Sequence, residues 1–204
     1  MKKITLILML IFCFASYAQA QSNNLFAKAK QKNWVFVLND KSLKINDLFN
    51  FENEILKISG GSTGYVRTAK KYKNFTLTVE YRWMGAAANS GVLVYIQDKD
   101  TVWPSCYQVQ QKVNAVGDII CMNGVNAAEL TDTVKFTVPK QKQPNEKPVG
   151  EWNKIKIVCR NGAMQVFVND ELQNSISGMS VSKGYIGFQA EGKPLEFKNL
   201  IISK

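Results

Sequence analysis

Residues 74–118, NFTLTVEYRWMGAAANSGVLVYIQDKDTVWPSCYQVQQKVNAVGD, contain three strand-like runs joined by two short polar loops. The first run alternates strictly, with one set of side chains apolar: Phe75, Leu77, Val79, Tyr81 and Trp83. The intervening residues are polar: Thr76, Thr78, Glu80 and Arg82. Strict alternation predicts a strand that packs one face on a core and turns the other to water or a ligand.

The second and third runs extend this pattern. Val92, Val94 and Ile96 take the apolar side of the second run, and Gln108 and Gln110 share a face of the third. If the three strands are neighbours, their polar residues line one surface of a sheet: Glu80, Arg82, Tyr95, Gln97, Gln108 and Gln110. With Trp103 nearby, such a surface suits a sugar, since hydroxyls need polar partners and the C–H face of the ring needs an aromatic. An ordinary solvated sheet face is the alternative.

Outside this stretch the chain continues as short strand-like runs between turn residues. Asn123-Gly124 and Asn161-Gly162 are strong hairpin signals. There is no long helical period, no repeat of fixed length and no linker that would divide residues 34–204. We therefore predict a single all-β domain over 34–204, a two-sheet antiparallel β-sandwich or jelly roll.

The N-terminus predicts export. Lys2 and Lys3 precede an apolar run that ends near a small-residue cleavage site at Ala18-Gln19-Ala20. We interpret residues 1–20 as a secretory signal peptide and 21–33 as a polar leader. The expected location is periplasmic or extracellular, and we expect no membrane span.

Charge and composition limit the kinds of partner and catalytic site that we expect. The formal charge of +10 falls to about +8 without the signal peptide. The lysines are scattered and no RNA-binding signature is present, so we expect no nucleic-acid partner. The chain has no histidine, which removes the commonest general base and metal ligand. The remaining Cys106, Cys121 and Cys159 are expected as small buried residues, with a Cys106–Cys121 bridge as the alternative.

Several ordered landmarks resemble a known family. They are Asn89-Ser90-Gly91-Val92, Val102-Trp103-Pro104, Val109-Gln110, Gly117-Asp118, Glu146-Lys147-Pro148, Gly150-Glu151-Trp152-Asn153, Val168-Asn169, Gly187-Phe188-Gln189 and Glu191-Gly192. Together they resemble the 3-keto-disaccharide hydrolase domain, common in secreted proteins of gut Bacteroidetes. The resemblance implies a concanavalin A-like sandwich that cleaves or recognises a sugar at its concave sheet.

Two positions depart from that family's pattern. Relatives often carry a histidine where Tyr95 stands and a glutamate where Gln108 stands, whereas Gln110, Asp118, Gln189 and Glu191 match. Exchange of glutamate for glutamine keeps the hydrogen-bonding shape but removes the titrating proton. The departures favour a non-catalytic, lectin-like module over a glycoside hydrolase, while the family label favours the hydrolase, and both hypotheses stay open.

Glycoside hydrolysis usually needs two carboxyl groups roughly 5–9.5 Å apart. We predict Glu191 and Asp118 as the catalytic pair. The predicted substrate-binding residues are Glu80, Arg82, Tyr95, Trp103, Gln108, Gln110 and Gln189. Non-catalytic alternatives are a turn-forming role for Asp118 and an Arg–Glu pair for Glu80. No metal or cofactor motif is present, so none is expected, and the oligomeric state stays open.

Overall fold

The computed structural model describes residues 24–27 and 32–204, and the expected signal peptide lies outside these ranges. The regular secondary structure of the described chain is almost entirely β, with one four-residue α-helix, α1 (Ile45–Leu48). No described helix has the length and apolarity to cross a membrane.

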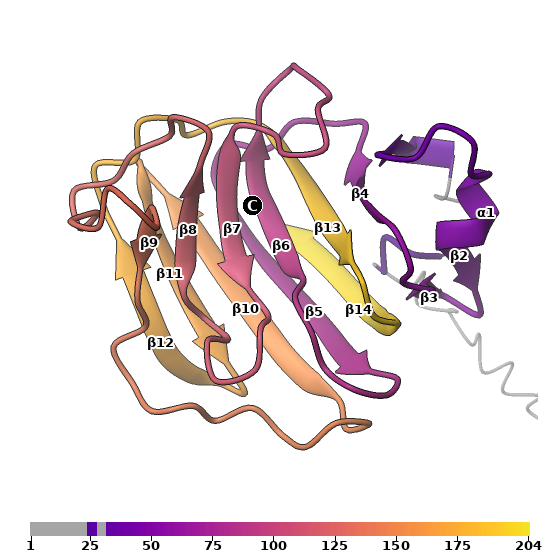
Figure 1. Ribbon diagram of the computed structural model, residues 1–204. Coiled ribbons are helices and arrows are strands. Elements are labelled where there is room, and N and C mark those ends of the chain that lie inside the picture. The colour runs from indigo at the N-terminus through magenta and orange to yellow at the C-terminus, as the bar shows by residue number, and fades with distance from the viewer. Residues whose placement is uncertain (1–23, 28–31) are drawn as a thin grey trace, which may run out of the picture.

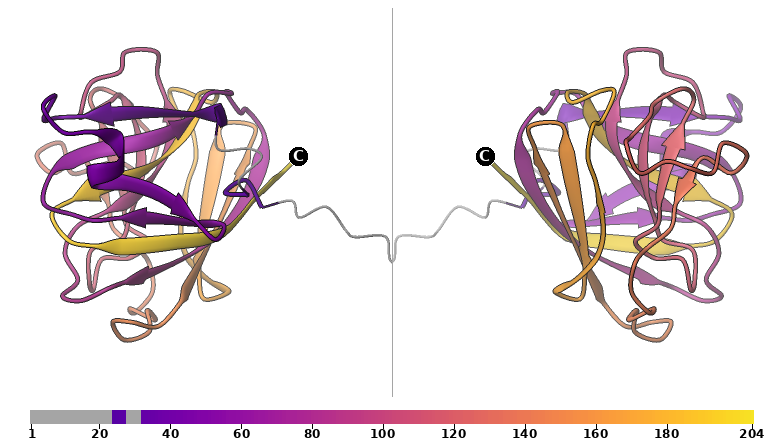
Figure 2. Two further views of the ribbon diagram at one scale, coloured as in Figure 1. Left: turned by 90° about the vertical axis from the view of Figure 1, so that its right-hand side faces the viewer. Right: turned by 90° about the vertical axis from the view of Figure 1, so that its left-hand side faces the viewer.

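Two seven-stranded antiparallel sheets form the molecule (Figure 1). Sheet A runs, in spatial order, β1 (Trp34–Leu38), β4 (Thr63–Thr68), β13 (Tyr185–Glu191), β6 (Gly91–Ile96), β7 (Cys106–Gln110), β8 (Ile119–Met122) and β9 (Thr137–Val138). Sheet B runs β12 (Glu171–Ile176), β11 (Ala163–Val168), β10 (Asn153–Arg160), β5 (Phe75–Trp83), β14 (Leu195–Ser203), β3 (Ile55–Ile58) and β2 (Phe49–Glu52). The right-hand view of Figure 2 shows β8 and β9 on one side and β11 and β12 on the other, as two layers. The predicted two-sheet β-sandwich is confirmed.

The core lies between the sheets. The alternation of β5 is as predicted, because its five apolar residues are all buried on the inner face of sheet B. Sheet A contributes the facing layer, including Val92, Val94, Val109 and Phe188. Asn161 and Gly162 both have positive φ, 48° and 75°, which is the conformation that a two-residue hairpin turn between β10 and β11 requires.

A β-bulge interrupts β6 at Tyr95. Ile186 of β13 pairs with Val94 and Tyr185 pairs with Ile96, so Tyr95 has no partner across the ladder. Its φ is +58°, an uncommon value for a residue with a side chain. The extra residue reverses the alternation, so Tyr95 joins the main core and Ile96 lies on the outer face of sheet A.

The three cysteines within the described ranges are free and buried. Cys121 belongs to the main core, whereas Cys106 packs in a separate apolar cluster with Val37, Tyr65, Leu93 and Ile96. Opposite faces of one sheet separate the two thiols, so the alternative of a Cys106–Cys121 bridge is wrong, and the prediction of small buried residues is confirmed.

Candidate functional site

The outer face of sheet A gathers most of the predicted polar site. Gly91 pairs with Gln110 and Leu93 with Gln108 across β6 and β7, and Leu93 also pairs with Gly187 of β13. Directly paired residues point to the same face of a sheet, and residues two apart on a strand do so as well. Gln108, Gln110, Gln189 and Glu191 therefore share one surface, which we call the glutamine face.

Side chains of the glutamine face hold one another in place. Oε2 of Glu191 accepts hydrogen bonds from Asn89 Nδ2 at 2.8 Å and from Gln189 Nε2 at 3.0 Å. Gln108 Nε2 donates to Gln110 Oε1 at 3.2 Å. The three glutamines are only 3–6% exposed, whereas Glu191 is partly exposed. The carboxylate is therefore the accessible part of a fixed polar network.

Two acceptors in this network have no partner. Asn89 Oδ1 and Gln189 Oε1 are buried, and no group in the described ranges donates to them. Buried polar atoms are nearly always hydrogen-bonded, and leaving one unpaired costs about 1–3 kcal/mol. Both atoms flank Glu191, so the geometry suits a ligand that brings hydroxyl or other N–H and O–H donors to this point.

Gly91 makes room for the network. A Cβ atom placed on it would stand 2.5 Å from Gln108 Cγ and 2.8 Å from Gln108 Nε2. Gln108 can therefore lie across β6 only because residue 91 has no side chain. The close approach that Gly91 permits is that of a side chain from the neighbouring strand.

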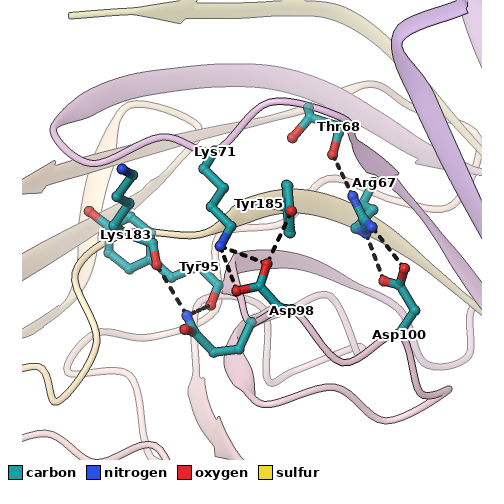
Figure 3. Close-up of polar contacts among 9 residues, drawn as sticks. Arg67, Thr68, Lys71, Tyr95, Asp98, Asp100, Lys183 and Tyr185 are labelled. Atoms are coloured by element: carbon teal, nitrogen blue, oxygen red, sulfur yellow. Dashed lines mark hydrogen bonds and ion pairs between the residues drawn. The ribbon is translucent and has the colours of Figure 1, made fainter.

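The neighbouring part of the same face is built around Arg67 of β4 (Figure 3). Its guanidinium donates from Nε and Nη2 to the two carboxylate oxygens of Asp100, both at 2.8 Å, and lies 3.9 Å from the centre of the Tyr185 ring. Asp98 accepts hydrogen bonds from Lys71 and from the Tyr185 hydroxyl. These contacts fasten the loop between β6 and β7 onto sheet A.

Two pKa values reflect this arrangement. The hydrogen bonds from Arg67 hold the pKa of the Asp100 carboxyl below its ordinary value. Burial, together with the Asp100 charge, raises the pKa of the Tyr65 hydroxyl. Asp100 is therefore charged and Tyr65 neutral throughout the physiological range.

Glu80 and Arg82 lie elsewhere, so the expectation that they share a surface with Gln108 and Gln110 is wrong. Both are on β5, which is in sheet B, and they point away from the core. Arg82 pairs with Glu196 at 2.7 Å, and its guanidinium lies 4.5 Å from the centre of the Trp152 ring. Glu80 accepts a hydrogen bond from Asn199 at 2.7 Å. The polar side of β5 is a paired sheet face on the opposite side of the molecule.

The prediction that Tyr95 lies on the polar outer surface is also wrong. The bulge directs it into the core, where its ring packs edge-to-face on Phe75 and its hydroxyl donates to the carbonyl of Lys73. Burial raises its pKa. The position that matches the family histidine thus lies inside the sandwich, and a tyrosine there is no sign of a lost catalytic group on the outer face.

Neither Asp118 nor Trp103 belongs to the hydrogen-bond network of the glutamine face. Asp118 offers its carbonyl to Gln110 N at 2.9 Å, while its carboxylate accepts the backbone N–H of Lys140 at 2.8 Å. That carboxylate therefore ties the start of β8 to a distant loop, which differs from both the catalytic role and the local turn-forming role that the sequence suggested. Trp103 is 44% exposed in the β6–β7 loop and lines a surface hollow with Gln97, Thr101 and Asn123.

Sequence reasoning missed Asn89, Arg67 and Asp100 as members of the outer face. Asn89 belongs to the Asn-Ser-Gly-Val landmark, to which we assigned no binding role, and only the pairing of β13 with β6 brings it to Glu191. Arg67 and Asp100 are 33 residues apart. A signal for Arg67 existed in the alternation of Tyr65 and Arg67 within one strand.

Several solved structures share this architecture. A "putative glycosyl hydrolase" from Parabacteroides distasonis ATCC 8503 is 18% identical and aligns with a TM-score of 0.62 over 84% of this chain and 88% of its own. The carbohydrate binding module CBM66 from Bacillus subtilis is 12% identical, with a TM-score of 0.60 over 84% and 96%. LamAcat from Zobellia galactanivorans is 12% identical, with a TM-score of 0.54 over 83% and 89%.

At these identities the likeness shows the fold alone. No curated protein matches the sequence. One family does match over nearly the whole length, at residues 21–203, and it is the family that the ordered landmarks resemble. The chain belongs to the 3-keto-alpha-glucoside-1,2-lyase-like domain family, also called the 3-keto-disaccharide hydrolase family.

Proposed function

We propose that the protein binds a carbohydrate on the glutamine face and cleaves a 3-keto glycoside there, with Glu191 as the proton acceptor. The observation that carries this proposal is the setting of Glu191. Two amides fix its Oε2, and the two unpartnered amide oxygens of Asn89 and Gln189 lie beside it. A sugar supplies the hydroxyl donors that these oxygens lack.

The family description names a 1,2-lyase, an enzyme that cleaves by elimination, and one carboxylate is sufficient to begin such a reaction. A ketone at C3 acidifies the proton on C2. Glu191 removes that proton, the electron pair forms the C1=C2 double bond, and the C1–O bond breaks to release the leaving group, which takes up a proton. Water added across the double bond would complete a net hydrolysis. This chemistry does not require the predicted partner carboxylate Asp118, whose oxygen already accepts the Lys140 N–H.

Gln108 has a side-chain donor of the kind that such a reaction needs. Negative charge develops on the C3 oxygen as the C2 proton leaves, and fixed amide N–H groups stabilise it. Gln108 Nε2 makes only two long contacts, at 3.2 Å to Gln110 Oε1 and at 3.4 Å to the Ser90 carbonyl. It can therefore turn toward a bound oxygen at small cost.

A binding-only function is the second candidate, and Gln108 itself favours it. Relatives often have a glutamate at this position, and glutamine binds hydroxyls without titrating. In either case the expected export places the sugar in the periplasm or outside the cell.

The test is an incubation of the purified protein with 3-keto disaccharides and with the parent disaccharides, following release of the leaving group. We expect turnover of the 3-keto compounds only, with a loss of about 100-fold or more in Glu191→Gln, the usual contribution of a general base. Glu151→Gln, which changes an exposed glutamate two residues before β10, is the matched control.

The outcomes separate the two candidates. Saturable binding without turnover, weakened in Gln189→Ala, would establish the lectin-like function and refute the elimination. Turnover that persists in Glu191→Gln would show that Glu191 is not the proton acceptor. No response to any sugar would contradict both candidates.

A further inference from the structure

A second cavity lies between the two sheets, at the end of the sandwich where β5 finishes and β10 begins. Its volume is about 350 Å³, in the range of small-ligand sites. Tyr81 and Trp83 of β5 line it together with Gln111, which follows β7, and with the loop that contains Pro144, Glu146 and Val149. Gln110 belongs to the outer face of sheet A and Gln111, the next residue, to the interior, so this cavity is separate from the glutamine face.

Gln111 is the first indication that the cavity receives a ligand. Its side chain is completely buried, yet neither Nε2 nor Oε1 has a hydrogen-bond partner among the described residues. A buried amide that leaves both its donor and its acceptor unused is unfavourable unless another molecule satisfies it.

Glu146 is the second indication. Its Oε1 accepts the backbone N–H of Asn114 at 2.6 Å, while its Oε2 is buried with no partner in the described chain. The same carboxylate helps to raise the pKa of the Tyr81 hydroxyl, after the larger effect of burial. The cavity thus offers a free carboxylate oxygen, a free amide and a neutral phenol.

The wall that closes the cavity is held firmly. Asn153 Oδ1 accepts hydrogen bonds from the backbone of Lys147 at 2.7 Å and from Asn169 Nδ2 at 2.9 Å, and Gly150 N donates to the Trp83 carbonyl at 3.1 Å. The Glu-Lys-Pro and Gly-Glu-Trp-Asn elements therefore act as the frame of this loop. A preformed wall lowers the entropy lost when a ligand binds.

The mouth of the cavity faces solvent. Val113 and Val149 both line it and are 45% and 52% exposed. A small molecule can therefore reach the buried polar groups past two apolar side chains.

We propose that this end cavity binds a single neutral sugar ring or similar polyol. A hydroxyl both donates and accepts, so it can satisfy Glu146 Oε2 and both atoms of the Gln111 amide. The apolar lining from Trp83, Val116 and Pro148 suits the C–H face of such a ring. A cationic amine fits less well, because Lys147 lines the cavity and Lys140 Nζ donates to the carbonyl of Asn114 at its wall.

The test follows the methyl NMR signals of Val113, Val116 and Val149 in the full chain while glucose, myo-inositol or methylammonium is added. We expect saturable shifts with glucose or myo-inositol in the unmodified protein and in Glu191→Gln. In Gln111→Met, which keeps the side-chain volume but removes the amide, we expect affinity at least tenfold weaker. This result does not depend on activity at the glutamine face, so it succeeds or fails independently of the proposed function.

Val149→Trp provides a second variant, because it blocks the exposed mouth without altering a buried group. It is expected to abolish the shifts while the melting temperature stays near that of the unmodified protein. Absence of shifts with both polyols, equal shifts in Gln111→Met, or saturable shifts with methylammonium alone would each overturn the proposal.

Discussion

Gly91 lies directly beneath Gln108, so close that an added Cβ would stand 2.5 Å from Gln108 Cγ. The two residues are on the neighbouring strands β6 and β7. Because Gly91 has no side chain, the side chain of Gln108 can lie flat across the sheet. The glutamine face therefore depends on a residue that contributes no functional group to it.

Gly91→Ala is expected to destabilise the fold by about 1–3 kcal/mol, the usual cost of overpacking a tight site. The double variant Gly91→Ala/Gln108→Ala should recover much of this loss, because it removes the atoms that clash. Urea unfolding measures both changes. Gly85→Ala is the matched control, since a Cβ there has no neighbour within 4 Å, and a similar loss in that variant would contradict the explanation.

Tyr95→Phe is expected to lower the free energy of unfolding by about 1 kcal/mol, because the buried hydroxyl loses its bond to the Lys73 carbonyl. Sugar binding and turnover at the glutamine face should be unchanged, because the ring points into the core. Thermal unfolding and the incubation with 3-keto disaccharides measure the two effects separately. A variant that folds with unchanged stability but loses binding would place Tyr95 back at the site.

Asp100→Asn should destabilise the protein at neutral pH and have no effect in strong acid. The hydrogen bonds from Arg67 lower the pKa of Asp100 in the folded state, so the pair stabilises the fold above the ordinary Asp value of about 3.9 and loses this contribution as pH falls through the lowered pKa. Because Asp100 is 36% exposed, solvent limits the effect to about 1 kcal/mol. Urea unfolding from neutral to acidic pH should show the two proteins converging, and a constant difference would refute the assignment.

The three described thiols should resist modification in the folded protein. Burial raises the pKa of Cys121 to about 11 and that of Cys159 to about 12, so neither forms thiolate near neutral pH. A thiol reagent at pH 8 should label Cys106, Cys121 and Cys159 only after denaturation, as mass spectrometry of the fragments would show. Fast labelling of any of these three in the native protein would contradict the burial.

Alternation and turn residues were sufficient to predict the sandwich and the sharing of one face by Gln108 and Gln110. Both are properties of local sequence. The partner of a strand is not local, and β5 shows the consequence. Its pattern matches that of β7, yet it lies in the opposite sheet, so Glu80 and Arg82 are remote from the glutamines. Alternation tells which residues share a face of a strand, but not which sheet contains that strand.

The bulge at Tyr95 could not be predicted from the local sequence either. Tyrosine rarely adopts positive φ, and nothing in the run Gly91–Ile96 indicates an extra residue. The space for it comes from Gly184, where a Cβ would stand 2.4 Å from the Tyr95 carbonyl carbon, 89 residues away in the chain. Arg67 and Asp100 are also far apart in the chain, by 33 residues, which explains why their pairing could not be predicted.

The placement of the last two strands has a consequence for the order in which the chain folds. β13 lies between β4 and β6 in the middle of sheet A, and β14 lies between β5 and β3 in the middle of sheet B. During synthesis, β3, β4, β5 and β6 therefore each lack one neighbouring strand until β13 and β14 have been made. A chain truncated before Tyr185 leaves both sheets divided, and pairings over such long separations form slowly. Neither sheet can therefore become continuous until residues 185–203 have been made.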